Sequence, residues 1–307
     1  MKRCHLLILS ALTCILNSCS QQSQPSEAFK QVWYAGKAEL SSYNLQQARY
    51  GEMRNGEAVL IFVTEDFSTD KLVKLDEPEN LNKKARVLKM NMTKSFVTGV
   101  YPYSMMLSVF TPVSEDGNER TLKVTSTVQE WCGQTFSSLK LKGSNYNWLL
   151  HSYFEQEGDQ DNKVDAVLPE DEIWNRIRIA PASLPQGKVE LLPGLLWQRL
   201  SHIAIKKEEA TISVSKADTS FLKDAAVQVC TIHYPALART LQIYFNADFP
   251  HQIQGWQETY PDGFGANKRM LTTRATLKKS LWLDYWKHNR LADSTFRDSL
   301  QIRQHEQ

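Results

Sequence analysis

The sequence predicts a mainly β protein, with one large antiparallel sheet, curved or closed into a half-open barrel, and a few short helices. The clearest observation is the run LKVTSTVQEWCGQTF from Leu122, in which side chains alternate in character along the chain. Alternation with a period of two is typical of a half-buried strand. One face of this strand should therefore pack on a core, and it consists of Leu122, Val124, Ser126 and Val128.

A second observation is the continuous apolar and β-branched run AVLIFVTEDF, which covers Ala58–Phe67. It follows Arg54-Asn55-Gly56-Glu57, and Asn-Gly between two strand-like runs is the strongest short-range hairpin signal. We therefore expect Tyr43–Met53 to pair with Ala58–Phe67 in an antiparallel hairpin that turns at Asn55-Gly56.

The C-terminal third supplies the third observation, a series of strand-like segments that read VQVCTIHYP, RTLQIYF, HQIQGWQETY and LTTRATLKKSLWLDYW. The last two are separated by Pro261-Asp262-Gly263-Phe264-Gly265, whose composition is typical of a turn. Closely spaced strands favour an antiparallel meander over parallel βαβ units. On the last strand, Trp282, Asp284 and Trp286 would share one face.

Helices are expected in few places. Proline and acidic residues at the start, with basic residues at the end, predict one helix over about 168–178, as the helix dipole prefers. A second should begin near Asp293 or Ser294 and turn Phe296, Leu300 and Ile302 inward. Residues 27–33 would form one or two turns of helix. We expect residues 27–307 to be a single large β-rich domain, with 157–170 as the place where it would subdivide.

Residues 1–18 have the features of a bacterial lipoprotein signal peptide. Lys2 and Arg3 precede the apolar run Leu6–Leu16, which is far shorter than the roughly 20 residues of a membrane-spanning helix. The next residues, Leu16-Asn17-Ser18-Cys19, resemble a lipobox, which implies cleavage before Cys19 and acylation of that cysteine. An ordinary secretory signal with an incidental Cys19 is the alternative.

Residues 19–26 would then be a flexible tether to the membrane. In related lipoproteins, acidic residues after the cysteine direct export to the cell surface, and Ser20-Gln21-Gln22-Ser23 contains none. We therefore expect an outer-membrane lipoprotein that faces the periplasm.

The expected mature chain is electrically balanced, because loss of Lys2 and Arg3 leaves 34 basic and 34 acidic residues. The expected mature chain therefore has no excess of positive charge that would favour a nucleic-acid partner. Beyond Cys19, only Cys132 and Cys230 remain, which could form a disulfide in an oxidising compartment or stay as two buried thiols. The sequence has no zinc-like spacing of cysteine and histidine, so neither a metal nor a cofactor is expected.

No sequence motif assigns a catalytic residue. Gly-x-Ser-x-Gly, His-Glu-x-x-His and a Gly-rich phosphate loop are all absent. His151 and His233 lie in apparent strands and are expected to be hydrogen-bonded structural residues. The acidic stretch from Glu155 to Asp165 lacks the order of an EF-hand loop and is expected to be a solvated hairpin tip.

The tetrapeptide Glu130-Trp131-Cys132-Gly133 is the most distinctive in the chain. A nucleophilic Cys132 would need a neighbouring base, and the local sequence supplies no histidine. Gly133 would permit a bulge or a close backbone approach.

Several segments together resemble a widespread set of uncharacterised envelope lipoproteins, many of them called "septum formation inhibitor Maf". They are residues 33–67, 96–113 (FVTGVYPYSMMLSVFTPV), 125–136, 172–193 (EIWNRIRIAPASLPQGKVELLP) and 275–289. The cytoplasmic Maf nucleotide pyrophosphatases contain a Ser-x-Ser-Pro-Arg-Arg loop, which is absent here, so their activity is not carried over. The resemblance supports the expected fold and an envelope location, and it adds no functional site.

Three classes of function remain. The leading hypothesis is a non-enzymatic envelope component that holds a protein partner, which predicts an exposed apolar patch. A carrier for a lipid-like apolar ligand predicts a deep apolar cavity. A periplasmic hydrolase predicts a cleft where a histidine, a carboxylate and a polar nucleophile converge.

Overall fold

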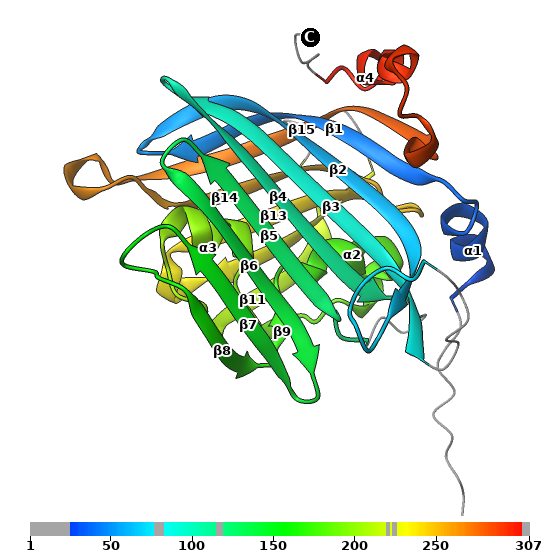
Figure 1. Cartoon of the computed structure of the whole chain (residues 1–307), viewed down its shortest axis with the longest axis horizontal. Helices are drawn as coiled ribbons and strands as arrows, with labels where there is room; N and C mark the ends of the chain where they lie inside the picture. Colours follow the sequence, from blue (N-terminus) through cyan, green and yellow to red (C-terminus); the bar gives the residue numbers. More distant parts are fainter. Residues whose placement is uncertain (1–24, 77–82, 115–118, 219–221, 223–225, 303–307) are drawn as a thin grey trace, which may run out of the picture.

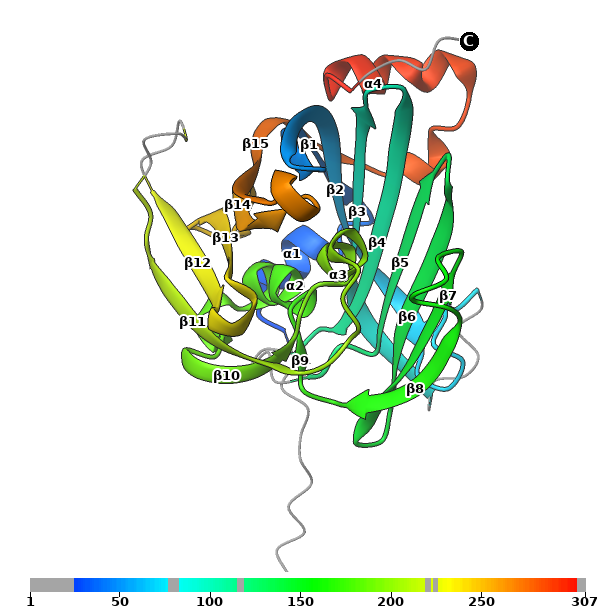
Figure 2. The same cartoon turned by 90° about the vertical axis from the view of Figure 1, so that its left-hand side faces the viewer.

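The fifteen strands of the computed structural model belong to one sheet, in the order β8-β7-β6-β5-β4-β3-β2-β1-β15-β14-β13-β12-β11-β10-β9. The structure describes residues 25–76, 83–114, 119–218, 222 and 226–302. Neighbouring strands are antiparallel, except for the short parallel pair β9 and β10. The edge strands β8 and β9 are not paired with each other, so the sheet is strongly curved but open (Figures 1 and 2). The predicted fold class is confirmed.

The N-terminal half of the sheet is a meander of long hairpins. Its strands are β1 (Ala38–Arg49), β2 (Glu52–Ser68), β3 (Lys84–Thr98), β4 (Tyr101–Pro112), β5 (Lys123–Glu130), β6 (Gly133–Lys142), β7 (Asn145–Ser152) and β8 (Gln160–Asp165). In β5, buried residues alternate with more exposed ones, as the sequence predicts. Val124, Ser126 and Val128 all face the interior, whereas Leu122 precedes the strand and packs in a separate cluster with Phe67 and Val87.

The C-terminal half is a second meander that returns to the first. Its strands are β9 (Leu168–Pro169), β10 (Gly187–Leu192), β11 (Glu208–Lys216), β12 (Val227–Tyr234), β13 (Arg239–Asn246), β14 (Ile253–Asp262) and β15 (Arg269–Leu283). The last strand, β15, pairs with β1 and joins the two meanders. The four C-terminal strands expected from the sequence are confirmed.

The predicted position of the first turn is wrong. β1 and β2 do form a hairpin, but it turns at Tyr50 and Gly51, whose φ angles of 59° and 74° are those of a type I′ turn. Gly56 lies inside β2, opposite Leu45. A Cβ atom at Gly56 would come within 2.8 Å of the Phe96 Cβ, so this glycine serves the close approach of β3 rather than a turn.

The expectation for the last tryptophans is also corrected. β15 ends at Leu283, and Trp286 lies in the short 3₁₀ turn η5 (Tyr285–Lys287), where it is largely exposed. Trp282 instead packs inward on Trp33, with 5.1 Å between the ring centroids. The two tryptophans therefore do not share one strand face.

The helices are α1 (Glu27–Trp33), α2 (Glu172–Ile179), α3 (Leu195–Ser201) and α4 (Thr295–Ser299), with further 3₁₀ turns η2 (Pro181–Ser183), η3 (Pro235–Leu237), η4 (Gly265–Asn267) and η6 (Leu291–Ser294). Helices near 27–33, 168–178 and 294 are confirmed, although α2 begins only after β9. Helix α3 was not expected. None of the helices in the described part of the chain is long and apolar enough to cross a membrane.

Helices α2 and α3 lie inside the curved sheet, between its two walls (Figure 2). Ile173 and Ile177 of α2 are fully buried, and Trp174 packs edge-on against Trp256 of β14. The side-chain amide of Asn175 donates to the Leu88 carbonyl oxygen at 2.9 Å. The chain thus fills the concave side of its own sheet.

Two buried ion-pair groups attach these helices to the sheet. Arg178 of α2 makes a bidentate pair with Glu39 of β1, at 2.7 and 2.6 Å. Arg239 of β13 binds both Glu258 of β14, at 2.8 Å, and Glu170, which precedes α2. Buried charges require such complete pairing, because an unpaired one carries a large desolvation penalty.

The C-terminal segment lies on the opposite, convex face. Leu300 packs with Ala38, Leu40 and Val63, and Ile302 packs against the same cluster. Lys278 of β15 donates to the Gln301 carbonyl oxygen at 2.5 Å. Phe296 contacts the His288 ring rather than this cluster.

Candidate functional site

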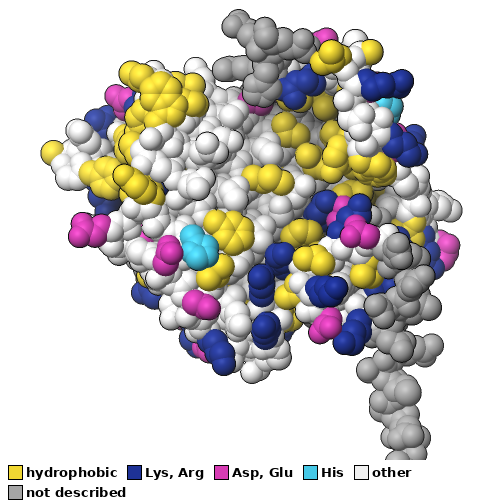
Figure 3. Space-filling view, viewed as in Figure 1, with side chains coloured by type: hydrophobic (Ala, Val, Ile, Leu, Met, Phe, Trp, Pro, Cys, Tyr) yellow, Lys and Arg dark blue, Asp and Glu magenta, His cyan; other side chains and the backbone are white. Residues whose placement is uncertain are grey.

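Five hairpin turns meet at one end of the molecule. Because successive strands alternate in direction, the β1–β2, β3–β4, β5–β6, β7–β8 and β14–β15 connections all lie at the left-hand end in Figure 1. Each contributes large apolar or aromatic side chains. The most exposed are Val100 (77%), Tyr153 (72%), Trp131 (70%) and Phe264 (60%). Hydrophobic side chains gather at this end in the space-filling view (Figure 3).

The aromatic rings of these turns form a continuous band. We call it the aromatic rim, and it consists of Tyr50, Tyr101, Trp131, Tyr153, Phe154, His202 and Phe264. Ring centroids are separated by 6.4 Å between Tyr101 and Trp131 and by 6.1 Å between Tyr50 and Phe264. From Phe264 the band continues through His202 to Phe154, at 6.3 and 5.5 Å, and then to Tyr153 at 5.9 Å.

Gly133 allows the two ends of this band to approach each other. A Cβ atom there would lie 2.6 Å from the Tyr153 ring, so any other residue would displace that ring. Gly133 is thus approached by a side chain of the β7–β8 loop, and not by the backbone segment expected from the sequence.

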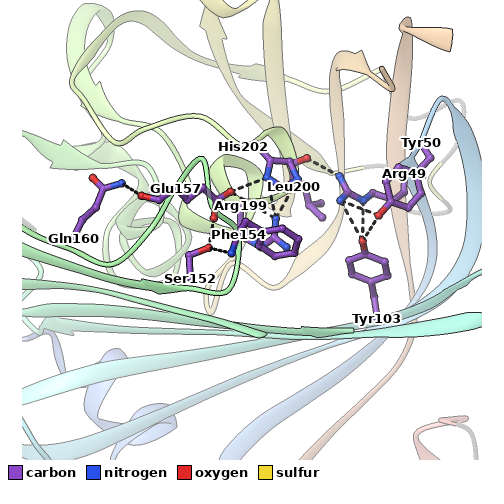
Figure 4. A network of polar contacts seen from close by, with 10 residues as sticks. All are labelled: Arg49, Tyr50, Tyr103, Ser152, Phe154, Glu157, Gln160, Arg199, Leu200 and His202. Carbon is purple, nitrogen blue, oxygen red and sulfur yellow. Dashed lines mark hydrogen bonds and ion pairs between the residues drawn. The ribbon is translucent and has the colours of Figure 1, made fainter. Parts of the chain in front are cut away.

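Behind the rim, Arg49 connects the turns to α3 (Figure 4). Its guanidinium donates to the Leu200 carbonyl oxygen at 2.6 Å and to the Tyr103 hydroxyl at 3.1 Å. Tyr103 in turn lies 2.7 Å from the Tyr50 hydroxyl. Arg49 is only 2% exposed, and the hydrogen bonds found for its guanidinium among the described residues go to the Leu200 carbonyl oxygen and to the hydroxyls of Tyr50 and Tyr103. A carbonyl at a helix C-terminus and two phenols thus hold a buried positive charge.

The β7–β8 loop reaches α3 through a second group of polar residues (Figure 4). Glu157 accepts hydrogen bonds from His202 Nδ1 at 2.7 Å and from the Ser152 hydroxyl at 2.5 Å. Arg199 lies 3.9 Å from Glu157, and its guanidinium covers the Phe154 ring at 4.3 Å. Burial would raise the pKa of Glu157, but the bonds from His202 and Ser152 and the charge of Arg199 lower it, so this carboxylate is ionised.

This group does not have the geometry of a hydrolytic triad. A triad needs a histidine that accepts the proton of the nucleophile, with the carboxylate behind the histidine. Here the carboxylate of Glu157 stands between Ser152 and His202, and the serine hydroxyl is bonded to the carboxylate. The arrangement orients the loop on α3 and does not activate Ser152.

A cavity of about 170 Å³ lies between α3 and the concave face of β5–β7, next to this group. It is lined by Ser126, Thr135, Ser137, Trp148, Leu150, Gln156, Glu157, Gln160, Leu195, Gln198, Arg199, His202, Ile203 and Ala204. An engineered cavity of roughly 150 Å³ accommodates benzene, so this one is of similar capacity. It is far too small for the acyl chains of a lipid.

The remaining predicted residues are not brought together. Cys132 is exposed in the β5–β6 turn, whereas Cys230 is buried in β12, and both are free thiols, so the disulfide considered for them is not formed. Burial raises the pKa of Cys230 to about 12. Cys19 lies outside the described residues.

The two strand histidines lie at the surface. His151 pairs with Asp159 at 3.1 Å, but the side chains are 56% and 68% exposed on the outer face. His233 is hydrogen-bonded to Thr240 at 3.0 Å and is also exposed. Among the described residues, no group of three or more histidine, cysteine or acidic side chains could hold a metal ion.

The structure adds residues that sequence reasoning missed. Glu157 was expected in a solvated hairpin tip but is mostly buried against His202. Arg49, Arg199 and His202 were not singled out, because the partners that place them in this group lie 42 to 151 positions away in the sequence. No local pattern could have identified them.

Comparison with known proteins yields no further assignment, since no family model, no curated protein and no solved structure matches this chain.

Proposed function

We propose that this protein is an outer-membrane lipoprotein, anchored through Cys19 and facing the periplasm, that binds a protein partner through the aromatic rim. The observation that carries the proposal is the band of aromatic side chains from five turns and the end of α3, in which Trp131, Tyr153 and Phe264 are exposed and the other rings are partly buried behind them. Contiguous exposed apolar patches on soluble surfaces mark interaction sites.

The composition of the rim supports a protein partner. Tyrosine, tryptophan and phenylalanine are enriched in protein interfaces and supply most of the binding energy there. The rim residues are fixed by ring contacts and by the Arg49 hydrogen bonds before any partner arrives. A preorganised surface loses little conformational entropy on binding, which favours affinity.

The position of the rim supports the same proposal. Helix α1, which follows the expected tether, lies at the opposite end of the sheet from the rim (Figure 1). The 12 residues of β1 separate the two ends by roughly 40 Å. A tether over residues 19–26 spans at most about 28 Å. The rim would therefore face the periplasm rather than the membrane that holds Cys19.

Neither alternative has comparable support. A lipid carrier needs a large, mostly apolar cavity, whereas α2 and α3 occupy the concave side and leave about 170 Å³ beside α3. The larger hollows, of about 460 to 580 Å³, lie on the outer face of the sheet and are lined by many polar side chains. A hydrolase of the serine type needs a histidine on the nucleophile, and Ser152 is bonded to Glu157 instead.

Site-specific photo-crosslinking in the bacterium that encodes the protein tests the proposal. A benzophenone amino acid is placed at Trp131 or at Phe264 in the full-length lipoprotein. The matched control is Leu291, which is 79% exposed but lies in η6, outside the rim. We expect both rim positions, and not Leu291, to form a covalent adduct with one and the same protein.

Two results would contradict the proposal. One is crosslinking of the rim positions to lipid alone, which would make the rim a membrane contact. The other is an adduct pattern that does not differ between the rim positions and Leu291. Trp131→Ser should also reduce crosslinking from Phe264, because both side chains would contact the same partner.

A further inference from the structure

The cavity behind the rim has two chemically different walls. Ser126, Thr135 and Ser137 present hydroxyl groups from β5 and β6. Trp148, Leu150, Leu195 and Ile203 supply an apolar surface from β7, α3 and the segment that follows α3. The loop residues Gln156, Glu157 and Gln160 lie along its edge. A molecule bound here would meet apolar and polar groups at once.

Arg199 is the charged residue of this cavity that lacks sufficient partners. It is 8% exposed, and its Nε atom is buried without a hydrogen-bond partner in the described part of the structure. One terminal nitrogen, Nη1, lies 3.2 Å from His202 Nε2, and Glu157 is 3.9 Å away, beyond hydrogen-bond distance. This Nε atom has almost no accessible surface, so a molecule in the cavity would contact the terminal nitrogens of the guanidinium instead.

The charges around Arg199 bear on whether it would bind an anion. The positive charge of Arg49 acts on Arg199 as well, and burial lowers the pKa of the Arg199 guanidinium despite the attraction of Glu157. An anion at Arg199 would compensate these two positive charges, and it would have to bind on the side of the guanidinium away from the ionised Glu157 carboxylate at the cavity edge. The planar guanidinium offers a fork of donors that fits a carboxylate.

The volume limits the rest of the ligand. A cavity of about 170 Å³ takes a six-membered ring with one small substituent, by comparison with the roughly 150 Å³ that accommodates benzene. The apolar wall formed by Trp148, Leu150 and Leu195 would contact the body of such a ring.

We propose that this cavity is a binding site for a small carboxylate whose apolar body is about the size of one ring. The carboxylate binds the Arg199 guanidinium, and the body packs on Trp148 and Leu195. The cavity shares His202 with the rim, but the proposal does not depend on partner binding there. No covalent step is involved.

The test is a titration with 4-fluorobenzoate, followed by ¹⁹F NMR, on the mature chain with Cys19→Ser. We expect saturable binding, weakened about tenfold or more by Arg199→Gln, because a charge-assisted hydrogen bond is lost. Arg290→Gln is the matched control, since it removes the same charge at a site that is 81% exposed. 4-Fluorobenzamide, which has the same shape without the charge, should bind more weakly and should not distinguish Arg199→Gln.

A second variant covers the case in which Arg199→Gln does not fold. Ser126→Leu fills the cavity and should abolish binding, with the thermal unfolding transition retained. Absence of saturable binding to the parent chain would overturn the proposal. So would benzoate binding that survives Ser126→Leu, or that Arg199→Gln and Arg290→Gln affect equally. The assay contains no protein partner, so its failure leaves the proposal for the rim untouched.

Discussion

Arg49 shows how a single residue holds several parts of the rim in place. Its guanidinium bonds the last turn of α3 through the Leu200 carbonyl and also contacts the hydroxyls of Tyr50 and Tyr103. Cations at helix C-termini are favourable, because the free carbonyls there carry partial negative charge. Glu130 acts similarly on the β5–β6 turn, where it accepts a hydrogen bond from the Cys132 backbone amide at 2.6 Å.

Glu130 also controls the thiol beside it, which gives a prediction for pH dependence. The hydrogen bond and negative charge of Glu130 raise the pKa of the exposed Cys132 thiol. Only the thiolate reacts with alkylating agents. We therefore expect Glu130→Gln to accelerate iodoacetamide labelling of Cys132 at pH 8, by making more thiolate available.

The rate of labelling against pH, read by mass spectrometry, checks this. In the chain that begins at residue 19 and carries Cys19→Ser, a single thiol should react under native conditions, and Cys230 should react only after unfolding, because it is fully buried. An unchanged or slower rate in Glu130→Gln would contradict the role given to this carboxylate.

At the scale of elements, the β1–β2 turn illustrates why a strong local signal failed. Asn55-Gly56 is a favoured hairpin sequence, yet the chain continues straight through it because β3 packs directly against Gly56. Tyr50-Gly51 forms the turn instead, five residues earlier. Pairing with β3 along 13 residues of β2 overrides the local preference.

Gly51 and Gly36 provide a matched pair for a stability measurement. Both have positive φ, +74° and +71°, but a Cβ at Gly51 would lie 2.5 Å from the Asn267 carbonyl oxygen, whereas one at Gly36 would meet nothing within 4 Å. We expect Gly36→Ala to lower the free energy of unfolding by about 1 kcal/mol. Gly51→Ala should cost about 2–4 kcal/mol.

Urea unfolding of the two variants measures the difference. Equal losses would mean that the η4 turn can move away from Gly51, in which case the β14–β15 hairpin is not fixed against the first turn. Since Phe264 lies in that hairpin, the result also reports how rigid the aromatic rim is.

For the whole molecule, the decisive feature is that a curved sheet encloses its own helices. The strands β1 and β15 pair across almost the full length of the chain, and α2 inserts between the two halves of the sheet. The Glu39–Arg178 pair joins α2 to β1, and both side chains are at most 1% exposed.

Replacing one member of the Glu39–Arg178 pair should lower the free energy of unfolding strongly. Replacing both members should lower it by less than the two single replacements added together. Arg178→Met or Glu39→Met leaves one buried charge unpaired, for which we expect a loss of about 3–5 kcal/mol in the free energy of unfolding. The double variant should be less destabilised than the sum of the single ones, since no unpaired charge remains. Denaturant unfolding of the two single variants and the double variant gives the three free energies of unfolding that this comparison needs. If the losses of the single variants simply add up in the double variant, the pair does not hold α2 in place.

Strands and helices that are specified by a few neighbouring residues could be predicted from the sequence alone. The alternation in β5, the run of β2, the C-terminal meander and the polar ends of α2 specify strands and a helix from a few neighbouring residues, because side-chain period and helix dipole act over short distances. The expectation of a lipoprotein signal before Cys19 likewise rests on adjacent residues. The tertiary structure decided the position of the first turn, the helix α3 and every contact behind the rim. These depend on residues such as Arg49 and Leu200, which are 151 positions apart and meet only when the sheet curves around its helices.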